Sequence, residues 1–143
     1  MVLEGIAYWA SITTPNTRFE PKYTIDVVLD STTAQELSDK GLNVKFDKEE
    51  GPTITVSRKV NGPNGMIRKA PSLMDRNKNQ LDCLVGNGSK VKVQAKPWEM
   101  TRNGQDFKGL ELQAVQVIDL VQYSSGDGDE FDILEDEQEV DEL

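Results

Sequence analysis

The side chains best suited to chemistry lie in one alternating stretch that runs from Ser89 to Trp98. Its apolar positions are Val91, Val93 and Ala95, and its polar positions are Lys90, Lys92, Gln94, Lys96 and Trp98. In a strand, successive side chains point to opposite faces, so one face of this stretch is apolar and the other is basic. Cations can follow the phosphates of a nucleic acid, and an exposed indole can stack on unpaired bases. The pattern therefore predicts binding of a single strand.

Further cations cluster around this stretch. Residues 51–108 hold eleven Lys and Arg against four Asp and Glu, whereas an ordinary protein surface mixes both signs. Any one outward lysine has an alternative role, which is to keep a strand soluble and to block edge pairing. Trp98 likewise has two open roles, base stacking and sealing of a barrel end. The candidate DNA-binding residues are Arg58, Lys59, Arg68, Lys69, Arg76, Lys78, Lys90, Lys92, Lys96, Trp98, Arg102, Phe107 and Lys108.

The remaining charge lies at the C-terminal end. Residues 126–143 contain ten acidic residues and neither Lys nor Arg, whereas the other 125 residues carry 16 bases and 15 acids. Like charges repel, and this segment has too little apolar surface to offset chain entropy, so we expect a disordered tail. A tethered acidic tail competes with DNA for a basic surface and then becomes available to partner proteins. Solubility and metal binding are the other roles considered, and metal ranks last because the spacing of a calcium loop is not met. The candidate partner-binding residues are Asp127, Asp129, Glu130, Phe131, Asp132, Glu135, Asp136, Glu137, Glu139, Asp141, Glu142 and Leu143.

Several kinds of chemistry are disfavoured by composition. The chain has no histidine and a single cysteine, Cys83, which removes the usual general base and makes zinc coordination nearly impossible. No nucleophile-elbow or phosphate-loop spacing occurs in the sequence. We therefore expect no enzyme, no metal and no cofactor, and we expect Cys83 to be a small buried hydrophobe. No apolar run reaches membrane-spanning length, so no membrane partner is expected.

The elements that must position these residues are mostly strands. Alternation and turn residues predict strands over 2–12, 23–29, 53–60, 89–98 and 107–123, with the last two forming a hairpin. A short helix is predicted between Thr33, which opens a Ser/Thr-x-x-Glu capping sequence, and Gly41, with Leu37 as its anchor. Residues 71–88 are predicted to be mostly irregular, with a short strand near Leu84. Tyr8 and Trp9 should point to opposite faces, so that at most one of them lies in the core.

This order of elements predicts a mainly β fold. Five or six strands and one short helix, without a βαβ rhythm, indicate an antiparallel barrel of the OB type over residues 1–124, followed by the acidic tail over 125–143. The rival fold is an immunoglobulin-like sandwich, which has more strands and no helix between its early strands. Phe19 and Tyr23 are expected to have structural roles.

Three stretches give the sequence a family resemblance. Residues 86–93, residues 109–117 with the acidic end, and more weakly residues 19–23 resemble the single-stranded DNA-binding proteins of short-tailed bacteriophages. The resemblance covers most of the chain and is strongest over the last sixty residues. It implies an OB fold that protects single strands during phage DNA replication and recombination, in the cytoplasm of the infected bacterial host. It also implies homodimers as one oligomeric state, and contacts from the tail to DNA polymerase and helicase-primase. The family's tail commonly ends in an aromatic residue, so either Leu143 or Phe131 is expected in that role here.

Two other functions are also compatible with the sequence. The first is a protein-interaction adaptor or DNA mimic that acts through the acidic tail and uses the barrel as a scaffold. The second is an RNA-binding OB module, which shares the same groove physics and differs in its response to the ribose hydroxyl.

Overall fold

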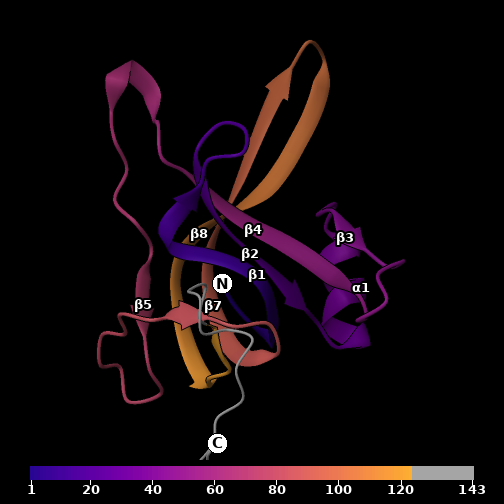
Figure 1. Cartoon of the computed structure of the whole chain (residues 1–143). Coiled ribbons are helices and arrows are strands. Elements are labelled where there is room, and N and C mark those ends of the chain that lie inside the picture. The colour runs from indigo at the N-terminus through magenta and orange to yellow at the C-terminus, as the bar shows by residue number, and fades with distance from the viewer. Residues whose placement is uncertain (124–143) are drawn as a thin grey trace, which may run out of the picture.

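The structure is a computed structural model that describes residues 1–123 (Figure 1). It contains nine strands, one α-helix and one short 3₁₀ helix within those residues. The strands are β1 (Val2–Asn16), β2 (Lys22–Val28), β3 (Val44–Lys45), β4 (Thr53–Lys59), β5 (Ser72–Met74), β6 (Leu84–Val85), β7 (Ser89–Arg102), β8 (Gln105–Asp119) and β9 (Gln122–Tyr123). The helices are α1 (Ser31–Asp39) and η1 (Pro63–Gly65).

Five strands close into a barrel. The sheet order β3-β4-β2-β1-β7-β8-β5, together with an additional pairing of β4 with β8, joins β1, β2, β4, β8 and β7 in a ring. The pairs along this ring are antiparallel except β4–β8, which is parallel and consists of Ser57 opposite Glu111. This arrangement is the OB fold that the sequence predicts, because a closed five-stranded ring has no place in a two-sheet sandwich.

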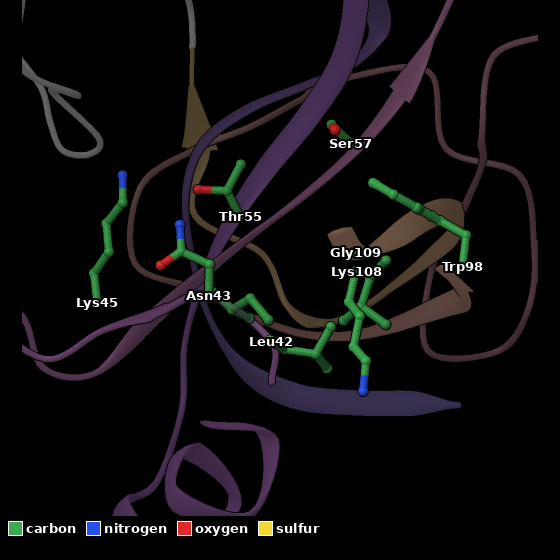
Figure 2. A pocket seen from close by; sticks show the side chains of 10 residues that line it. Leu42, Asn43, Lys45, Thr55, Ser57, Trp98, Lys108 and Gly109 are labelled. Carbon is green, nitrogen blue, oxygen red and sulfur yellow. The ribbon is translucent and has the colours of Figure 1, made fainter. Parts of the chain in front are cut away.

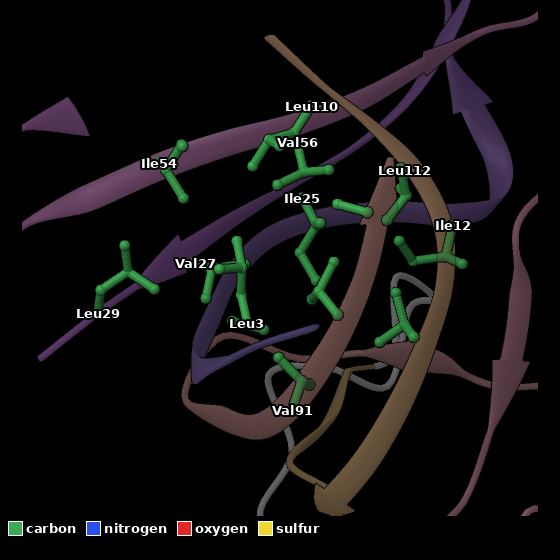
Figure 3. Close-up of a cluster of buried hydrophobic side chains, with 14 of the residues drawn as sticks. Leu3, Ile12, Ile25, Val27, Leu29, Ile54, Val56, Val91, Leu110 and Leu112 are labelled. Atoms are coloured by element: carbon green, nitrogen blue, oxygen red, sulfur yellow. The ribbon is translucent and has the colours of Figure 1, made fainter. Parts of the chain in front are cut away.

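Strict alternation fills the barrel. Val91, Val93 and Ala95 of β7 are completely buried, whereas the polar residues that alternate with them, Lys90, Lys92, Gln94 and Lys96, are exposed, so the predicted division of this strand into two faces is confirmed. The same period of two turns Ile25 and Val27 of β2 inward. Figure 3 shows aliphatic side chains of several strands, among them Ile25, Val27 and Val91, gathered inside the ring. Packing of this kind holds the outer surface of β4 and β7 in a fixed position.

Helix α1 (Ser31–Asp39) starts three residues earlier than the capping sequence at Thr33 predicts. Asp30 is the N-cap, and its carboxylate accepts hydrogen bonds from the backbone N–H of Thr33 at 2.8 Å and from the Thr33 hydroxyl at 2.9 Å. These two bonds stabilise the charged form and lower the pKa of Asp30. Leu37 is 4% exposed, which confirms it as the anchor of the helix on the barrel.

The first strand bends sharply at its aromatic pair. Trp9 has a φ of +52° and lies at a register shift between Tyr8 and Ser11, so the strand carries a bulge there. The Trp9 N–H donates to Oδ1 of Asn87 at 2.8 Å. Tyr8 is half-buried and Trp9 is 68% exposed, so neither enters the core. This agrees with the expectation that at most one of them would.

The structure confirms the expected role of Tyr23 but not those of Phe19 and Cys83. Tyr23 is buried, as expected of a structural residue, but Phe19 is 80% exposed and lies in the loop between β1 and β2. Cys83 is half-buried rather than buried, because it sits in a loop beside β6 rather than on a core face. The segment 71–88 holds two short strands, β5 and β6, and the latter is the predicted strand near Leu84.

One end of the barrel carries the long projections. Strands β7 and β8 continue beyond the ring as a hairpin that turns at Asn103 and Gly104, whose φ values of +54° and +76° fit the tight turn that such a pair favours. Figure 1 shows this orange hairpin and the magenta loop 60–71 rising past the same end of the barrel.

Candidate nucleic-acid interface

Two adjoining hollows meet at the outer surface of β4, and together they are called the hairpin groove here. They share Ser57 and Trp98 and have volumes of about 200 Å³ and about 420 Å³. The first is lined by Leu42, Asn43, Lys45, Ile54, Thr55, Ser57, Trp98, Lys108, Gly109 and Leu110. The second is lined by Ser57, Lys59, Arg68, Lys96, Pro97, Trp98, Met100 and Glu111. Figure 2 shows the first hollow, with Trp98 and Lys45 on opposite sides of the β4 residues Thr55 and Ser57.

The lining of the groove is basic. Among residues 1–123, five cationic side chains and one acidic side chain, Glu111, line it, and the cations come from β3, β4, the loop 60–71 and the β7–β8 hairpin. Two of the cations, Lys59 and Lys108, lie near Glu20 and Glu99, which do not line the groove. Cations gathered in a concave surface attract a polyanion more strongly than the same charges spread over a sphere. The five are Lys45, Lys59, Arg68, Lys96 and Lys108.

Trp98 lies where the two hollows meet, and a glycine fixes its ring. Gly109 is its direct partner across the hairpin, and a Cβ atom on Gly109 would lie 2.5 Å from Cζ2 of the indole. The indole therefore lies directly against Gly109 of β8, and Trp98 is still 44% exposed. One part of the ring packs and another part is open to a ligand, so the structure is compatible with both roles left open for Trp98.

The exposed ring continues into an apolar strip along the hairpin. Met100 and Phe107 are direct cross-strand partners, and Met100 lies two residues beyond Trp98 on the same strand face. Met100 is 45% exposed and Phe107 is 39% exposed. Phe107 is among the residues predicted from the sequence to bind DNA but lines neither hollow, whereas Met100 lines the second hollow and is marked in the sequence only by its spacing of two from Trp98.

Two of the candidate arginines already have a partner in the protein. Nη1 of Arg58 lies 3.4 Å from Oε1 of Glu111, and Nε of Arg68 lies 3.7 Å from Oε2 of the same carboxylate. Arg58 is held further by a 2.8 Å hydrogen bond from its Nε to the carbonyl of Lys69. Of the two guanidinium groups, only that of Arg68 lines the groove.

Only one end of the lysine face of β7 reaches the groove. Lys96 lines the groove, whereas Lys90 lies 3.7 Å from Glu4 on β1. Six residues of extended strand separate Lys90 from Lys96, which is about 20 Å. Lys92 lies between them, beside β1 and β8. The predicted stripe is therefore continuous on one strand but reaches the groove only at the Lys96 end.

The remaining candidate cations differ in whether they line the groove. Lys59 is 3.7 Å from Glu20, and Nζ of Lys108 donates to the carbonyl of Lys40 at 3.1 Å. Lys78 lines a separate hollow with Thr13, residues 70–74 and residues 80–82. Three further candidates line neither hollow of the groove: Lys69, Arg76 and Arg102.

Several groove residues were not anticipated from the sequence. Lys45 is on the short strand β3, and Thr55 and Ser57 are outward positions of β4 that alternation places correctly without indicating a function. Phe19 carries the guanidinium of Arg18 at 5.8 Å from its ring centroid. The loop that holds this pair is tied to β4 through the Glu20–Lys59 ion pair, so it borders the groove.

Some expectations concern features outside this surface. The acidic tail and its candidate residues lie outside residues 1–123. Within residues 1–123, no three His, Cys, Asp or Glu side chains are grouped so that they could hold a metal ion. No helix in that same part of the chain is long and apolar enough to cross a membrane.

Comparison with known proteins identifies the fold. No family model matches the sequence, and no curated protein matches it. Among solved structures, the chain is similar to the single-stranded DNA-binding protein from bacteriophage Enc34, with a TM-score of 0.61 and 14% identity, over 87% of this chain and 83% of that chain. The Enc34 protein in complex with single-stranded DNA gives a TM-score of 0.60 at 14% identity, over 87% of each chain. A single-stranded DNA-binding protein encoded by bacteriophage T7 also gives 0.60 at 14% identity, over 89% of this chain and 95% of that chain.

Proposed function

We propose that this OB-fold chain is a non-enzymatic protein that binds single-stranded DNA without sequence specificity in the hairpin groove. The observation that carries the proposal is the meeting of five cations with the half-exposed ring of Trp98 on one concave surface. Cations bind phosphates whatever base they carry, and every base has a face on which an indole can stack. Both attractions are therefore indifferent to sequence.

The arrangement favours a single strand over a duplex. Stacking on Trp98 and on the neighbouring Phe107 requires bases that are not already stacked in a helix. Phe19, on the loop that borders β4, offers another exposed ring beside the cation of Arg18. The similar Enc34 protein has been solved with single-stranded DNA, which is consistent with such a ligand for this fold.

Titration with oligonucleotides tests the proposal. We expect a 30-nucleotide oligo-dT to bind, with affinity that falls steeply as salt rises. If all five groove cations contact phosphates, the slope of log K against log salt is about −3.5, because each contact on a single strand contributes about −0.7. Duplex DNA of the same length should bind more weakly, and oligo-rU tests the RNA alternative. No detectable binding of oligo-dT at about 50 mM salt would refute the proposal.

The acidic tail is proposed to compete with DNA and to recruit partners. Its ten acids match a groove with an excess of cations, and tethering gives the tail a high effective concentration there. Released by DNA, it would contact replication proteins such as DNA polymerase and helicase-primase. These contacts would serve phage DNA replication and recombination in the cytoplasm of the infected host, with a homodimer as one form of the protein.

Two variants separate the charge of the tail from its length. Deletion of residues 125–143 and replacement of the ten tail acids by their amides should both tighten binding to oligo-dT. An unchanged affinity in the amide variant would show that the tail does not compete through charge. An adaptor that acts only through its tail would keep its partner contacts when Lys59 and Lys96 are both changed to Glu. A DNA-binding protein would lose its affinity for oligo-dT in that variant.

A further inference from the structure

Glu111, the one acidic side chain among residues 1–123 that lines the hairpin groove, has an unusual position. It lies on β8 opposite Ser57, at the one residue pair that joins β4 to β8 and closes the barrel. Its carboxylate is 29% exposed and lines the second hollow with Lys59, Lys96 and Arg68. A carboxylate among these cations opposes the approach of a phosphate, so its presence in a DNA-binding groove needs an explanation.

The two oxygens of Glu111 are divided between two arginines. Oε1 faces Arg58 at 3.4 Å and Oε2 faces Arg68 at 3.7 Å. A guanidinium has the same fork of donors for a carboxylate as for a phosphate. Glu111 therefore occupies the side of Arg68 from which a backbone phosphate could bind.

The two arginines differ in how firmly the protein holds them. Besides Glu111, Arg58 donates from Nε to the Lys69 carbonyl at 2.8 Å, a short hydrogen bond. Arg68 donates from Nη1 to the Asn61 carbonyl at 3.3 Å, which is long for a bond of this kind. Because the contacts of Arg68 are longer and its side chain lines the groove, Arg68 is the arginine that a ligand can take over.

We infer that Glu111 is a built-in competitor of the DNA backbone. In the free protein it holds Arg68, and in the complex a phosphate replaces it on Arg68 while Glu111 stays with Arg58. The inference rests on the proposed binding of single-stranded DNA in this groove. Its consequence is that Glu111 lowers the affinity for DNA, because the phosphate must displace a carboxylate that already occupies Arg68.

Neutralising the carboxylate is the direct test. Glu111→Gln should bind 30-nucleotide oligo-dT about three- to tenfold more tightly than the unmodified chain, because one like charge close to the phosphate is removed at a partly exposed site. The slope of log K against log salt should change by less than about 0.7, because Arg68 contacts a phosphate in the complex of both proteins. Thermal unfolding of each variant establishes that it is folded under the assay conditions.

A matched control separates this effect from a change in net charge. Glu4 pairs with Lys90 at 3.7 Å outside the groove, so Glu4→Gln changes the total charge by the same amount. We expect its affinity to stay within about twofold of the unmodified chain, since exposed charges farther away than a Debye length are largely screened. Equal tightening by Glu4→Gln and Glu111→Gln would overturn the inference.

Double variants test which arginine is released. Arg68→Gln should weaken binding more when Glu111 is already Gln than when Glu111 is present, because only then is Arg68 free for the phosphate before DNA arrives. Arg58→Gln should show no such coupling in DNA affinity. If Glu111→Gln is too unstable to assay, Glu111→Asp draws the carboxylate back from Arg68 by one methylene and should tighten binding to a smaller extent.

The outcomes distinguish the two proposals. If the unmodified chain binds oligo-dT and Glu111→Gln or Glu111→Asp binds equally well or more weakly, Glu111 is a structural residue and this inference fails alone. If the unmodified chain does not bind oligo-dT, the proposed function itself fails.

Discussion

Trp98 offers the sharpest separation of structural and functional roles, because its ring both packs and is exposed. The perturbation is Trp98→Ala, with Trp98→Phe as the conservative companion. Somewhat more than half of Trp98 is buried, in part against Gly109, and this corresponds to about 120 Å² of an indole. At about 25 cal/mol per Å², the loss of packing lowers the free energy of unfolding by at most about 3 kcal/mol.

The effect on DNA affinity is calculated separately from the exposed part of the ring. One stacked base contributes about 1 to 3 kcal/mol, so Trp98→Ala should weaken oligo-dT binding about five- to 150-fold. Trp98→Phe keeps a smaller aromatic face and should lose clearly less affinity than the alanine variant.

Two assays on the same variants give the answer. Thermal unfolding reports the loss of packing, and titration of fluorescein-labelled oligo-dT followed by anisotropy reports affinity without relying on tryptophan emission. A folded Trp98→Ala protein whose Kd stays within twofold of that of the unmodified chain would assign Trp98 to rim packing alone and refute the stacking role.

Three further changes give distinct expectations. Lys96→Glu should weaken oligo-dT binding about tenfold or more, whereas Lys92→Glu, on the same strand face but outside the groove, should change it less than about threefold. Gly109→Ala should tilt the Trp98 ring away from β8, lowering the free energy of unfolding by about 1 to 3 kcal/mol, measured by urea titration, and weakening DNA binding together with it. The folded-state pKa of Asp30 is lowered, so the contribution of its carboxylate to stability is present above its unfolded-state pKa and is lost as pH falls through the folded-state pKa. Asp30→Ala should therefore lose less stability in acid than the unmodified chain. Thermal unfolding between about pH 2 and pH 6 measures this difference.

The parts of the fold that depend on local pattern were predictable from the sequence. Alternation assigned the buried and exposed faces of β7, because a strand has a side-chain period of two. Asn103 and Gly104 marked the hairpin turn, since both central residues of such a turn need a positive φ. The order of strands then left the OB barrel as the simplest closed arrangement.

The parts that depend on distant contacts were not predictable. Which residues line the groove depends on closure of the barrel, where Ser57 pairs with Glu111. These two residues are far apart in the sequence, so no local pattern predicts their pairing. The same closure places Glu111 beside both Arg58 and Arg68. Nothing in the sequence pattern indicates that these two arginines share an acidic partner. The bulge that exposes Trp9 is likewise a response to the bend of β1 between two neighbouring strands.

Charge alone was a poor guide to which cations share a surface. The stripe from Lys90 to Lys96 is continuous along one strand, yet only its last lysine lines the groove, because the strand is longer than the groove is wide. Lys45, from a two-residue strand that sequence patterns cannot detect, lines the groove as well.

The placement of single-stranded DNA against Trp98 is tested most directly by tryptophan fluorescence, since the chain has two tryptophans. In a Trp9→Phe variant, Trp98 is the sole emitter, and saturating oligo-dT should quench it strongly, with the quenching reversed by about 1 M salt. The complementary Trp98→Phe variant, which reports on Trp9 alone, should show little change. Unaltered Trp98 emission while anisotropy records bound DNA would contradict the account.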